Sequence, residues 1–143
     1  MAETKDVKSS ASKDFKQLRV KDIMEKDIQY GHASTKAEVL GSLMIEGFGG
    51  VPIVDKKQNL VGIVTEFDLL AELDSGKSLG DVKAQDIMTT EVIRVSPHAD
   101  MQTLIGVLQN NHLIRFPVVD QEGTLVGIVA RRDIVRGYLS AAP

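Results

Sequence analysis

The sequence predicts an α+β fold made of two β-α-β-β-α repeats that pack through their sheets. An internal repeat carries most of this prediction, since Asp22-Ile23-Met24 returns as Asp86-Ile87-Met88, and Leu60–Val64 returns as Leu125–Val129. Short apolar runs on either side of turn residues indicate a β-hairpin in each repeat. Apolar residues at helical spacing lie before and after each hairpin, which adds two helices to each repeat.

The first helix of each repeat is predicted from a start signal and an apolar stripe. In the first repeat a capping box, Thr35-x-x-Glu38, comes before the stripe, which consists of Val39, Leu40, Leu43 and Met44. In the second repeat Ser96 is a good N-cap, because Pro97 follows it at the first helical position. The stripe of the second repeat consists of Met101, Leu104, Ile105 and Leu108.

The hairpin and the closing helix follow in the same order in both repeats. The predicted strands are Val51–Val54 and Leu60–Val64 in the first repeat, and Phe116–Val119 and Leu125–Val129 in the second. The predicted closing helices are Phe67–Leu73 and Asp133–Leu139. Each repeat has roughly sixty residues, and a domain of that size buries too little surface to be more than marginally stable alone. The two repeats should therefore form one core.

These elements divide the chain into two repeats, a linker and two tails. The expected order is a flexible polar tail (1–17), the first repeat (18–73), a linker (74–80), the second repeat (81–139) and a C-terminal tail (140–143).

Composition narrows the class of protein. Hydrophobic residues make up 43% of the 143 residues and charged residues 26%, which is typical of a globular protein. Cysteine is absent from the sequence, which excludes disulfides, a thiolate nucleophile and a cysteine-zinc site. The start of the chain is polar, and no apolar run approaches the ~20 residues that span a bilayer. We therefore expect a soluble cytoplasmic protein with no membrane insertion.

The repeated motifs together resemble a tandem pair of CBS domains, named for cystathionine β-synthase and often called a Bateman module. The matching motifs, which cover roughly residues 18–139, are V-K-D-I-M (Val20–Met24), A-Q-D-I-M-T (Ala84–Thr89), V-S-P-x-A-D (Val95–Asp100), and h-P-h-V-D and L-V-G-I-V-x-x-x-D in both copies. The resemblance implies pseudo-twofold symmetry, two clefts and adenosyl ligands such as AMP, ADP or ATP. It also implies a stand-alone regulatory module that forms a homodimer and needs no cofactor, while the regulated protein stays unidentified.

Two aspartates are candidates for ribose binding. In the family, the aspartate that ends G-h-h-T-x-x-D accepts hydrogen bonds from ribose hydroxyls, so Asp68 and Asp133 take this role by the match. Thr65 supplies the nearby hydroxyl in the first copy, whereas Ala130 stands in its place in the second. The alternative is a purely structural role, because Thr65-x-x-Asp68 is also typical of an N-cap with an acid in the first helical turn.

The resemblance further implies that each cleft is shared between the repeats. The Asp68 cleft should be completed by Met88, Thr89, Val92, Leu113, Ile114 and Arg115. The Asp133 cleft should be completed by Met24, Ile28, Phe48, Gly49 and Gly50. Aliphatic side chains would enclose adenine there, which suits a sequence with only 4% aromatic residues.

Phosphate binding requires cations or a helix N-terminus. Arg115, Arg131 and Arg132 gather around the motif of the second copy, and three arginines near one predicted cleft favour phosphate contact over solvated surface positions. The first copy has Gly49-Gly50 and Glu66-Phe67 at the corresponding places, so it offers no local cation. We therefore expect two unequal clefts, one better suited to ribose and the other to phosphate.

These features are compatible with two functions and disfavour three others. The leading hypothesis is a non-catalytic sensor of adenosyl ligands that signals occupancy to a partner protein. The alternative is a ligand-free module that dimerises and docks on a partner enzyme or transporter. Binding of single-stranded nucleic acid is disfavoured by the net charge of −3 and by the lack of stacking aromatics. We find no nucleophile–base pair and no metal-ligand spacing among the three histidines, so we expect neither an enzyme nor a metal protein.

Overall fold

The computed structural model describes residues 14–46, 49–112 and 114–141. In this part of the chain the helices are α2 (Val20–Ile23), α3 (Ala37–Ile45), α4 (Glu66–Asp74), α5 (Ala84–Ile87), α6 (Met101–Asn111) and α7 (Arg131–Ser140). The strands are β1 (Gly50–Val54), β2 (Leu60–Thr65), β3 (Arg115–Val119) and β4 (Leu125–Ala130). Short 3-10 helices span η1 (Phe15–Gln17) and η2 (Leu79–Asp81). Most of the expected N-terminal tail lies outside the described residues, as do Pro143 and its neighbour.

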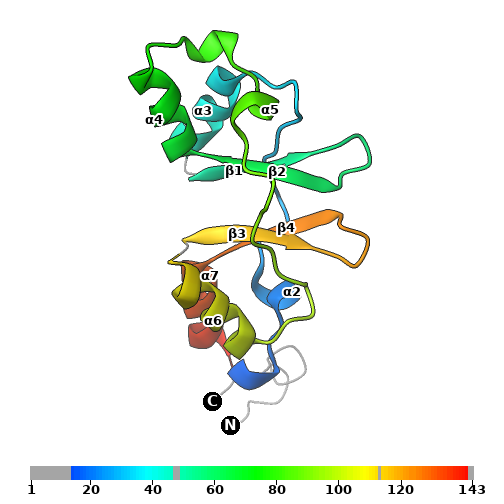
Figure 1. Cartoon of the computed structure of the whole chain (residues 1–143). Coiled ribbons are helices and arrows are strands. Elements are labelled where there is room, and N and C mark those ends of the chain that lie inside the picture. The colour runs from blue at the N-terminus through cyan, green and yellow to red at the C-terminus, as the bar shows by residue number, and fades with distance from the viewer. Residues whose placement is uncertain (1–13, 47–48, 113, 142–143) are drawn as a thin grey trace.

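Two antiparallel hairpins form the centre of the molecule. Val51 pairs with Val64 in β1–β2, and Phe116 pairs with Val129 in β3–β4, so the two repeats share one register. Figure 1 shows the two hairpins facing each other, with helices on the outer side of each. Every residue of β1 is buried because one face meets helices and the other meets the second hairpin. The predicted α+β fold is confirmed, and the predicted strands are correct to within one residue at each end.

The first strand expected in each repeat is reduced to a single parallel β-bridge. Gly31 donates its N–H to Pro52 O (2.9 Å) and accepts from Val54 N (2.9 Å). Val95 makes the equivalent bridge to Val118 in the second repeat. In each repeat this single bridge places the segment that precedes α3 or α6 beside the hairpin.

The first helices begin later than the sequence signals predict. Thr35 does not cap α3, because its Oγ1 accepts a hydrogen bond from His32 N (2.9 Å) in the preceding turn. Ser96 likewise accepts from His98 N (3.0 Å), and the N-cap of α6 is Asp100. The hydroxyl groups satisfy local turns instead of the helix N-terminus, a competition that is common for Ser and Thr. The predicted apolar stripes lie on these helices, and Leu40 and Leu104 at their centres are fully buried.

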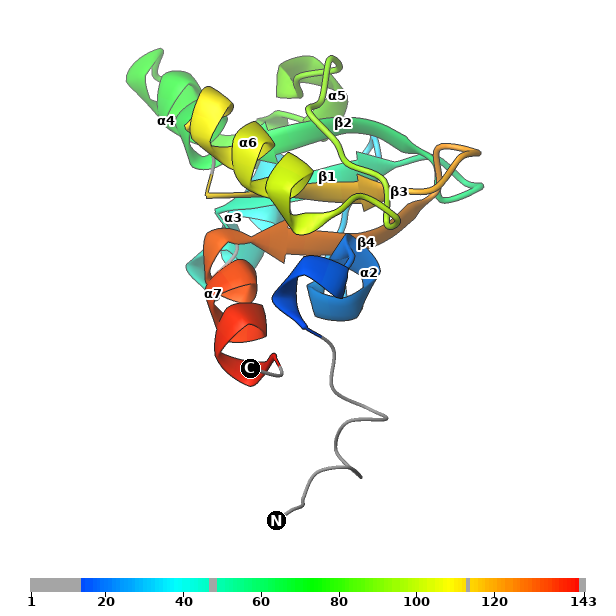
Figure 2. The ribbon, with the colours of Figure 1, turned by 90° about the horizontal axis from the view of Figure 1, so that it is seen from below.

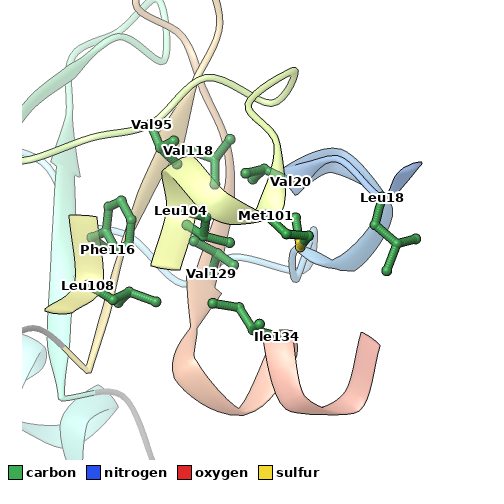
Figure 3. Packing of buried hydrophobic residues seen from close by; sticks show 10 residues of the cluster. All are labelled: Leu18, Val20, Val95, Met101, Leu104, Leu108, Phe116, Val118, Val129 and Ile134. Carbon is green, nitrogen blue, oxygen red and sulfur yellow. The ribbon is translucent and has the colours of Figure 1, made fainter. Parts of the chain in front are cut away.

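Each half of the molecule takes its opening helix from the other repeat. Val20 of α2 is fully buried in the cluster that includes Leu104 and Phe116, as Figure 3 shows. Ala84 of α5 is fully buried in the other cluster, with Leu40. The repeats are therefore interlocked, because each hydrophobic core combines the opening helix of one repeat with the hairpin and the longer helices of the other.

The two hairpin turns also contact each other. Leu60 N donates to Gly123 O (3.0 Å), and Leu125 N donates to Gln58 O (3.0 Å). Gln58 and Gly123 both have left-handed backbone angles, with φ of 70° and 89°, which glycine adopts without a steric penalty. This symmetric pair of bonds fixes the hairpins side by side, and Figure 2 shows the resulting stack from below.

Candidate functional site

Two cavities lie at equivalent positions of the two repeats. The first cavity, of about 620 Å³, includes Thr65 at the end of β2. The second cavity, of about 440 Å³, includes Ala130 at the end of β4. Gly50 and Arg115, which begin β1 and β3, line both cavities. The two cavities therefore share residues at the place where the repeats meet.

The first cavity has mainly apolar walls drawn from both repeats. Of the residues predicted from the sequence, it is lined by Gly49, Gly50, Thr65, Thr89, Val92, Ile114 and Arg115. Further apolar lining comes from Met44, Ile63, Phe67, Ile93, Phe116 and Pro117, which the sequence alone did not single out. Two acids, Glu66 and Glu91, also line it. This composition suits a flat, largely apolar ligand with a polar edge.

Thr65 lines the first cavity, whereas Asp68, its hydrogen-bond partner, and Met88 do not. Asp68 Oδ2 accepts hydrogen bonds from Thr65 N (2.7 Å) and Thr65 Oγ1 (3.1 Å). Asp68 N in turn lies 3.4 Å from Thr65 Oγ1, which completes a reciprocal cap at the start of α4. The structural alternative is therefore present in the fold. Among the described residues Asp68 Oδ1 has no hydrogen-bond partner, so the cap uses only one oxygen of this carboxylate.

The opening segments of the opposite repeats close the inner side of each cavity. Thr89 exchanges two backbone hydrogen bonds of 2.9 Å with Ile63 of β2. Met88 packs over Gly62, where the Cβ of any larger residue would lie 2.7 Å from its Sδ. Glu25 and Met24 hold the same places against Ile128 and Gly127. Glycine in each G-I-V motif thus allows the opposite opening segment to approach the strand closely.

The second cavity is polar and charged. Of the predicted residues, it is lined by Ile28, Gly50, Arg115, Arg132 and Asp133. The cavity is also lined by Ala130, which stands in the place of Thr65, and by residues that the sequence did not single out: Glu25, Asp27, Gln29, Glu46, Pro52, Ile128 and Arg136. Met24 packs against Gly127 and does not line the second cavity, and Gly49 lines only the first. Phe48 and Leu113 lie outside the described residues.

Arg131 is directed to a different part of the molecule from Arg132. It lines a third cavity between α6 and α7, together with Ile105, Leu108, Gln109, His112, Ile134 and Val135. The two residues are consecutive on α7, so their side chains leave the helix about 100° apart. Arg115, Arg132 and Arg136 are instead the three arginines that the structure places at the second cavity.

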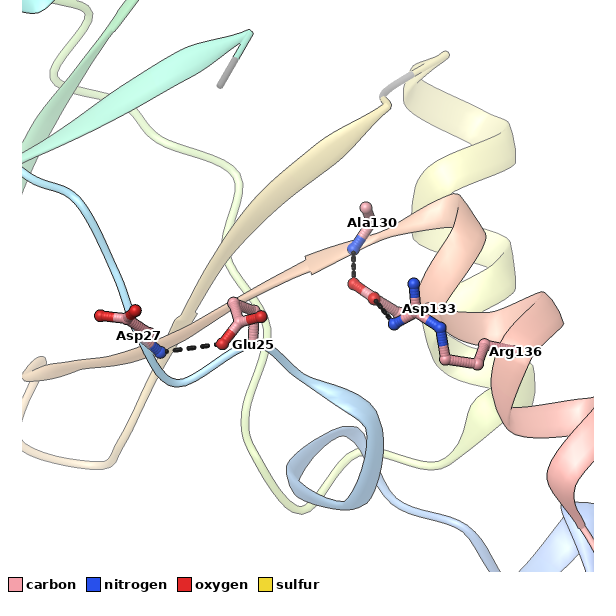
Figure 4. A network of polar contacts seen from close by, with 5 residues as sticks. All are labelled: Glu25, Asp27, Ala130, Asp133 and Arg136. Carbon is pink, nitrogen blue, oxygen red and sulfur yellow. Dashed lines mark hydrogen bonds and ion pairs between the residues drawn. The ribbon is translucent and has the colours of Figure 1, made fainter. Parts of the chain in front are cut away.

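Asp133 is the buried acid of the second cavity, with 7% of its surface exposed. Its Oδ2 accepts a hydrogen bond from Ala130 N (2.7 Å), and its Oδ1 lies 3.2 Å from Arg136 Nη1. Figure 4 shows the carboxylate held between these two partners. Ala130 cannot contribute the hydroxyl that Thr65 provides in the first repeat. The spacing Asp133-x-x-Arg136 was the sequence signal for this ion pair, because residues three apart are neighbours on a helix.

Arg115 is influenced by the charges of both cavities. Burial lowers the pKa of its guanidinium, and the positive charge of Arg132 lowers it further. Asp133 at the second cavity and Glu66 at the first raise it. An arginine stays charged at neutral pH despite such shifts, so Arg115 supplies a positive charge to both cavities.

The described part of the chain lacks a metal-ligand cluster and a helix that could cross a membrane. Within residues 14–46, 49–112 and 114–141, no group of three or more His, Cys, Asp or Glu is placed to hold a metal ion. The same part of the chain contains no helix with the length and apolarity needed to cross a membrane.

Sequence comparison identifies the family of both repeats. The model of the CBS domain matches residues 20–75 and 84–140. An uncharacterized protein of Methanopyrus kandleri is 33% identical over 131 residues, which is 89% of this chain and 67% of that protein. Inosine-5'-monophosphate dehydrogenase of Methanocaldococcus jannaschii is 33% identical over 110 residues. The match spans 76% of this chain but only 21% of that enzyme, so the similarity carries no dehydrogenase activity over to this chain.

Solved structures with the same architecture include complexes with adenosyl compounds. CBSX2 in complex with AMP has a TM-score of 0.74 and 29% identity, covering 85% of this chain and 96% of CBSX2. The CBS domain pair of protein MJ0100, in complex with 5'-methylthioadenosine and S-adenosyl-L-methionine, has a TM-score of 0.72 and 29% identity. That comparison covers 83% of this chain and 94% of the other.

Proposed function

The chain belongs to the CBS domain family, with two copies of the domain in tandem, and on this premise we propose that it is a non-catalytic regulatory module. It binds adenosyl ligands such as AMP, ADP or ATP in the cavities between the repeats, and signals their occupancy to a partner protein. The cytoplasmic location and the homodimer expected from the sequence are part of the same proposal.

One observation carries the proposal, namely an apolar cavity of about 620 Å³ that is lined by Thr65, whose hydroxyl is hydrogen-bonded to Asp68. Small-molecule sites commonly enclose roughly 300–1,000 Å³ and combine apolar walls with a few placed polar groups. The remaining oxygen of Asp68 is an acceptor for a ribose hydroxyl, and a charge-assisted bond of this kind is stronger than a neutral one. Aliphatic residues such as Val92 and Ile114 would contact the faces of adenine.

The complexes of related structures support this choice of ligand. CBSX2 holds AMP, and the MJ0100 domain pair holds two other adenosyl compounds, each at 29% identity to this chain. The ligands share an adenosine group and differ in what is attached to the ribose. We therefore expect the features that the two cavities share to bind the adenosine group. The charges that differ between the cavities should select the group attached to the ribose.

Isothermal titration of the chain with AMP, ATP and S-adenosylmethionine tests the proposal. Replacing Asp68 with alanine should weaken binding at the first cavity about tenfold, the effect of losing a charge-assisted bond of about 1.5 kcal/mol. Asp86→Ala is the matched control, because Asp86 likewise caps its helix by accepting from Lys83 N (3.0 Å), but it lies at a different cavity with Lys77 and Asp81 and has no bond to Thr65. Unchanged affinity in Asp68→Ala contradicts the ribose assignment, and no binding of any of the three compounds contradicts the proposed function.

A second candidate function is supported by the exposed faces of the closing helices. Phe67 at the start of α4 is 81% exposed and Leu139 of α7 is 76% exposed, and each has apolar neighbours on its helix. Exposed apolar residues that gather in one place are typical of surfaces that contact another protein. A ligand-free interaction module would give no response to adenosyl compounds and a stable dimer in light scattering.

A further inference from the structure

The two repeats differ at the residue three positions after the cavity aspartate. Arg136 follows Asp133 at this spacing on α7, whereas Ala71 follows Asp68 on α4. Arg136 makes an ion pair of 3.2 Å with Asp133 and lines the second cavity. Ala71 is exposed and carries no charge. The second cavity therefore contains a cation at its aspartate that the first cavity lacks.

This ion pair changes what the aspartate offers to a ligand. Both oxygens of Asp133 have partners, because Oδ2 accepts from Ala130 N (2.7 Å) and Oδ1 accepts from Arg136 (3.2 Å). In the first repeat the cap uses only Oδ2 of Asp68. A ribose hydroxyl that approaches Asp133 Oδ1 must compete with Arg136, whereas one that approaches Asp68 Oδ1 meets no such competitor among the described residues.

The cost of this competition depends on the ligand. The side chain of Arg136 is 67% exposed and that of Asp133 is 9% exposed, so the arginine is free to turn while the acid is fixed. A neutral nucleoside that displaces Arg136 gives it no new anionic partner. A ligand with a phosphate offers the guanidinium two acceptor oxygens, which match its paired donors, so the charge of Arg136 stays paired. Arg115 and Arg132 line the same cavity and add to this preference.

We propose that Arg136 makes the second cavity selective for adenosyl ligands that carry an anionic group, over neutral nucleosides. The inference rests on the proposed function, since it requires that adenosyl ligands enter this cavity. Arg136 acts as a specificity-determining residue, and Ala71 leaves the first cavity without this selectivity. Three carboxylates, those of Glu25, Asp27 and Glu46, also line the second cavity. They lower the affinity for phosphate in every variant alike, so the test compares ratios of affinities.

The test measures the dissociation constants of AMP and adenosine by isothermal titration in an Asp68→Ala background, which weakens the first cavity. We expect Arg136→Gln to lower the ratio Kd(adenosine)/Kd(AMP) about tenfold, the effect of one charge-assisted hydrogen bond. Arg131→Gln is the matched control, because this arginine lies on the same helix and lines a different cavity. It should leave the ratio unchanged.

A reciprocal variant tests the inference without altering the second cavity's arginines. Ala71→Arg places an arginine at an exposed position of α4, three residues after Asp68. In an Asp133→Ala background, this substitution should raise the ratio for the first cavity about tenfold. An unchanged ratio in both Arg136→Gln and Ala71→Arg overturns the role of Arg136. If the wild-type protein binds neither AMP nor adenosine, the proposed function itself fails.

Discussion

Replacing Gly62 with alanine should destabilise the protein and disturb the first cavity at the same time. A Cβ at this position would lie 2.7 Å from Met88 Sδ and 3.0 Å from Thr89 O. The methionine side chain can turn aside, because it is flexible. The Thr89 carbonyl cannot do so freely, because it accepts a hydrogen bond from Ile63 N (2.9 Å). The alanine methyl therefore pushes the opening segment of the second repeat away from β2.

The expected loss of unfolding free energy follows from this overlap. Adding a methyl group to a closely packed site usually costs about 1–3 kcal/mol, and the fixed carbonyl places Gly62→Ala in that range. Thr89 lines the first cavity, so its displacement should also weaken ligand binding there. Gly127→Ala should have the corresponding effect on the second cavity, because its Cβ would lie 3.2 Å from Glu25 O.

Urea denaturation followed by circular dichroism measures the stability change, and isothermal titration with AMP measures the change in binding. Gly106→Ala is a control that should change the unfolding free energy in the opposite direction. Gly106 lies within α6 and nothing is within 4 Å of a Cβ placed there. Alanine at this open helical position should stabilise the protein by about 0.5–1 kcal/mol. A Gly62→Ala protein whose unfolding free energy is within about 0.5 kcal/mol of the wild type refutes the close approach of Met88 and Thr89 to β2.

Ala130→Thr should give α7 the hydroxyl cap that it lacks and raise the unfolding free energy by about 0.5–1 kcal/mol in urea denaturation; no gain would show that the hydroxyl cannot reach the helix N-terminus. Arg115→Ala should weaken AMP binding at both cavities and Arg132→Ala only at the second; site-resolved titration that finds equal effects contradicts this division. The backbone hydrogen bond from Asn59 lowers the pKa of Asp55 below its ordinary 3.8, so its contribution to stability is present above about pH 4 and is lost as the pH falls through the lowered value. Thermal melts of Asp55→Asn should therefore lose less stability on acidification than those of the wild type, and an equal loss would exclude Asp55 as a contributor.

The hairpins could be predicted closely because their signals are local. Val51–Val54 and Leu60–Val64 are short β-branched runs around a polar turn, and the structure extends them to Gly50 and Thr65. The helix starts were less predictable, because Thr35 and Ser96 have two local options for their hydroxyl groups. Both choose the turn that precedes the helix. The sequence shows that a hydroxyl group is present to accept a hydrogen bond, but it does not show which of two nearby N–H groups will donate to it.

The composition of the cavities was predictable only in part, because it depends on tertiary placement. The resemblance placed Met24 and Ile28 at the cleft of the other repeat, but the periodicity of the sequence did not indicate that Val20 would be buried with Leu104. That exchange also brings Glu25 and Asp27 to the second cavity. Arg131 was grouped with Arg132 by sequence proximity, yet successive helical residues point about 100° apart and these two line different cavities.

The inequality of the two cavities arises from four differences within one repeated framework, one of which is Arg132 in place of Phe67. Where the first repeat has Thr65 and Ala71, the second has Ala130 and Arg136, so the hydroxyl partner of the acid is replaced by a guanidinium. Arg115 belongs to the second repeat but lines both cavities, whereas the corresponding glycine, Gly50, brings no charge. Two bound phosphates would therefore share one arginine, while the second cavity keeps two more of its own. Because binding coupling is reciprocal, an anionic ligand in either cavity should lower the attraction of the other for a second anion by the same factor.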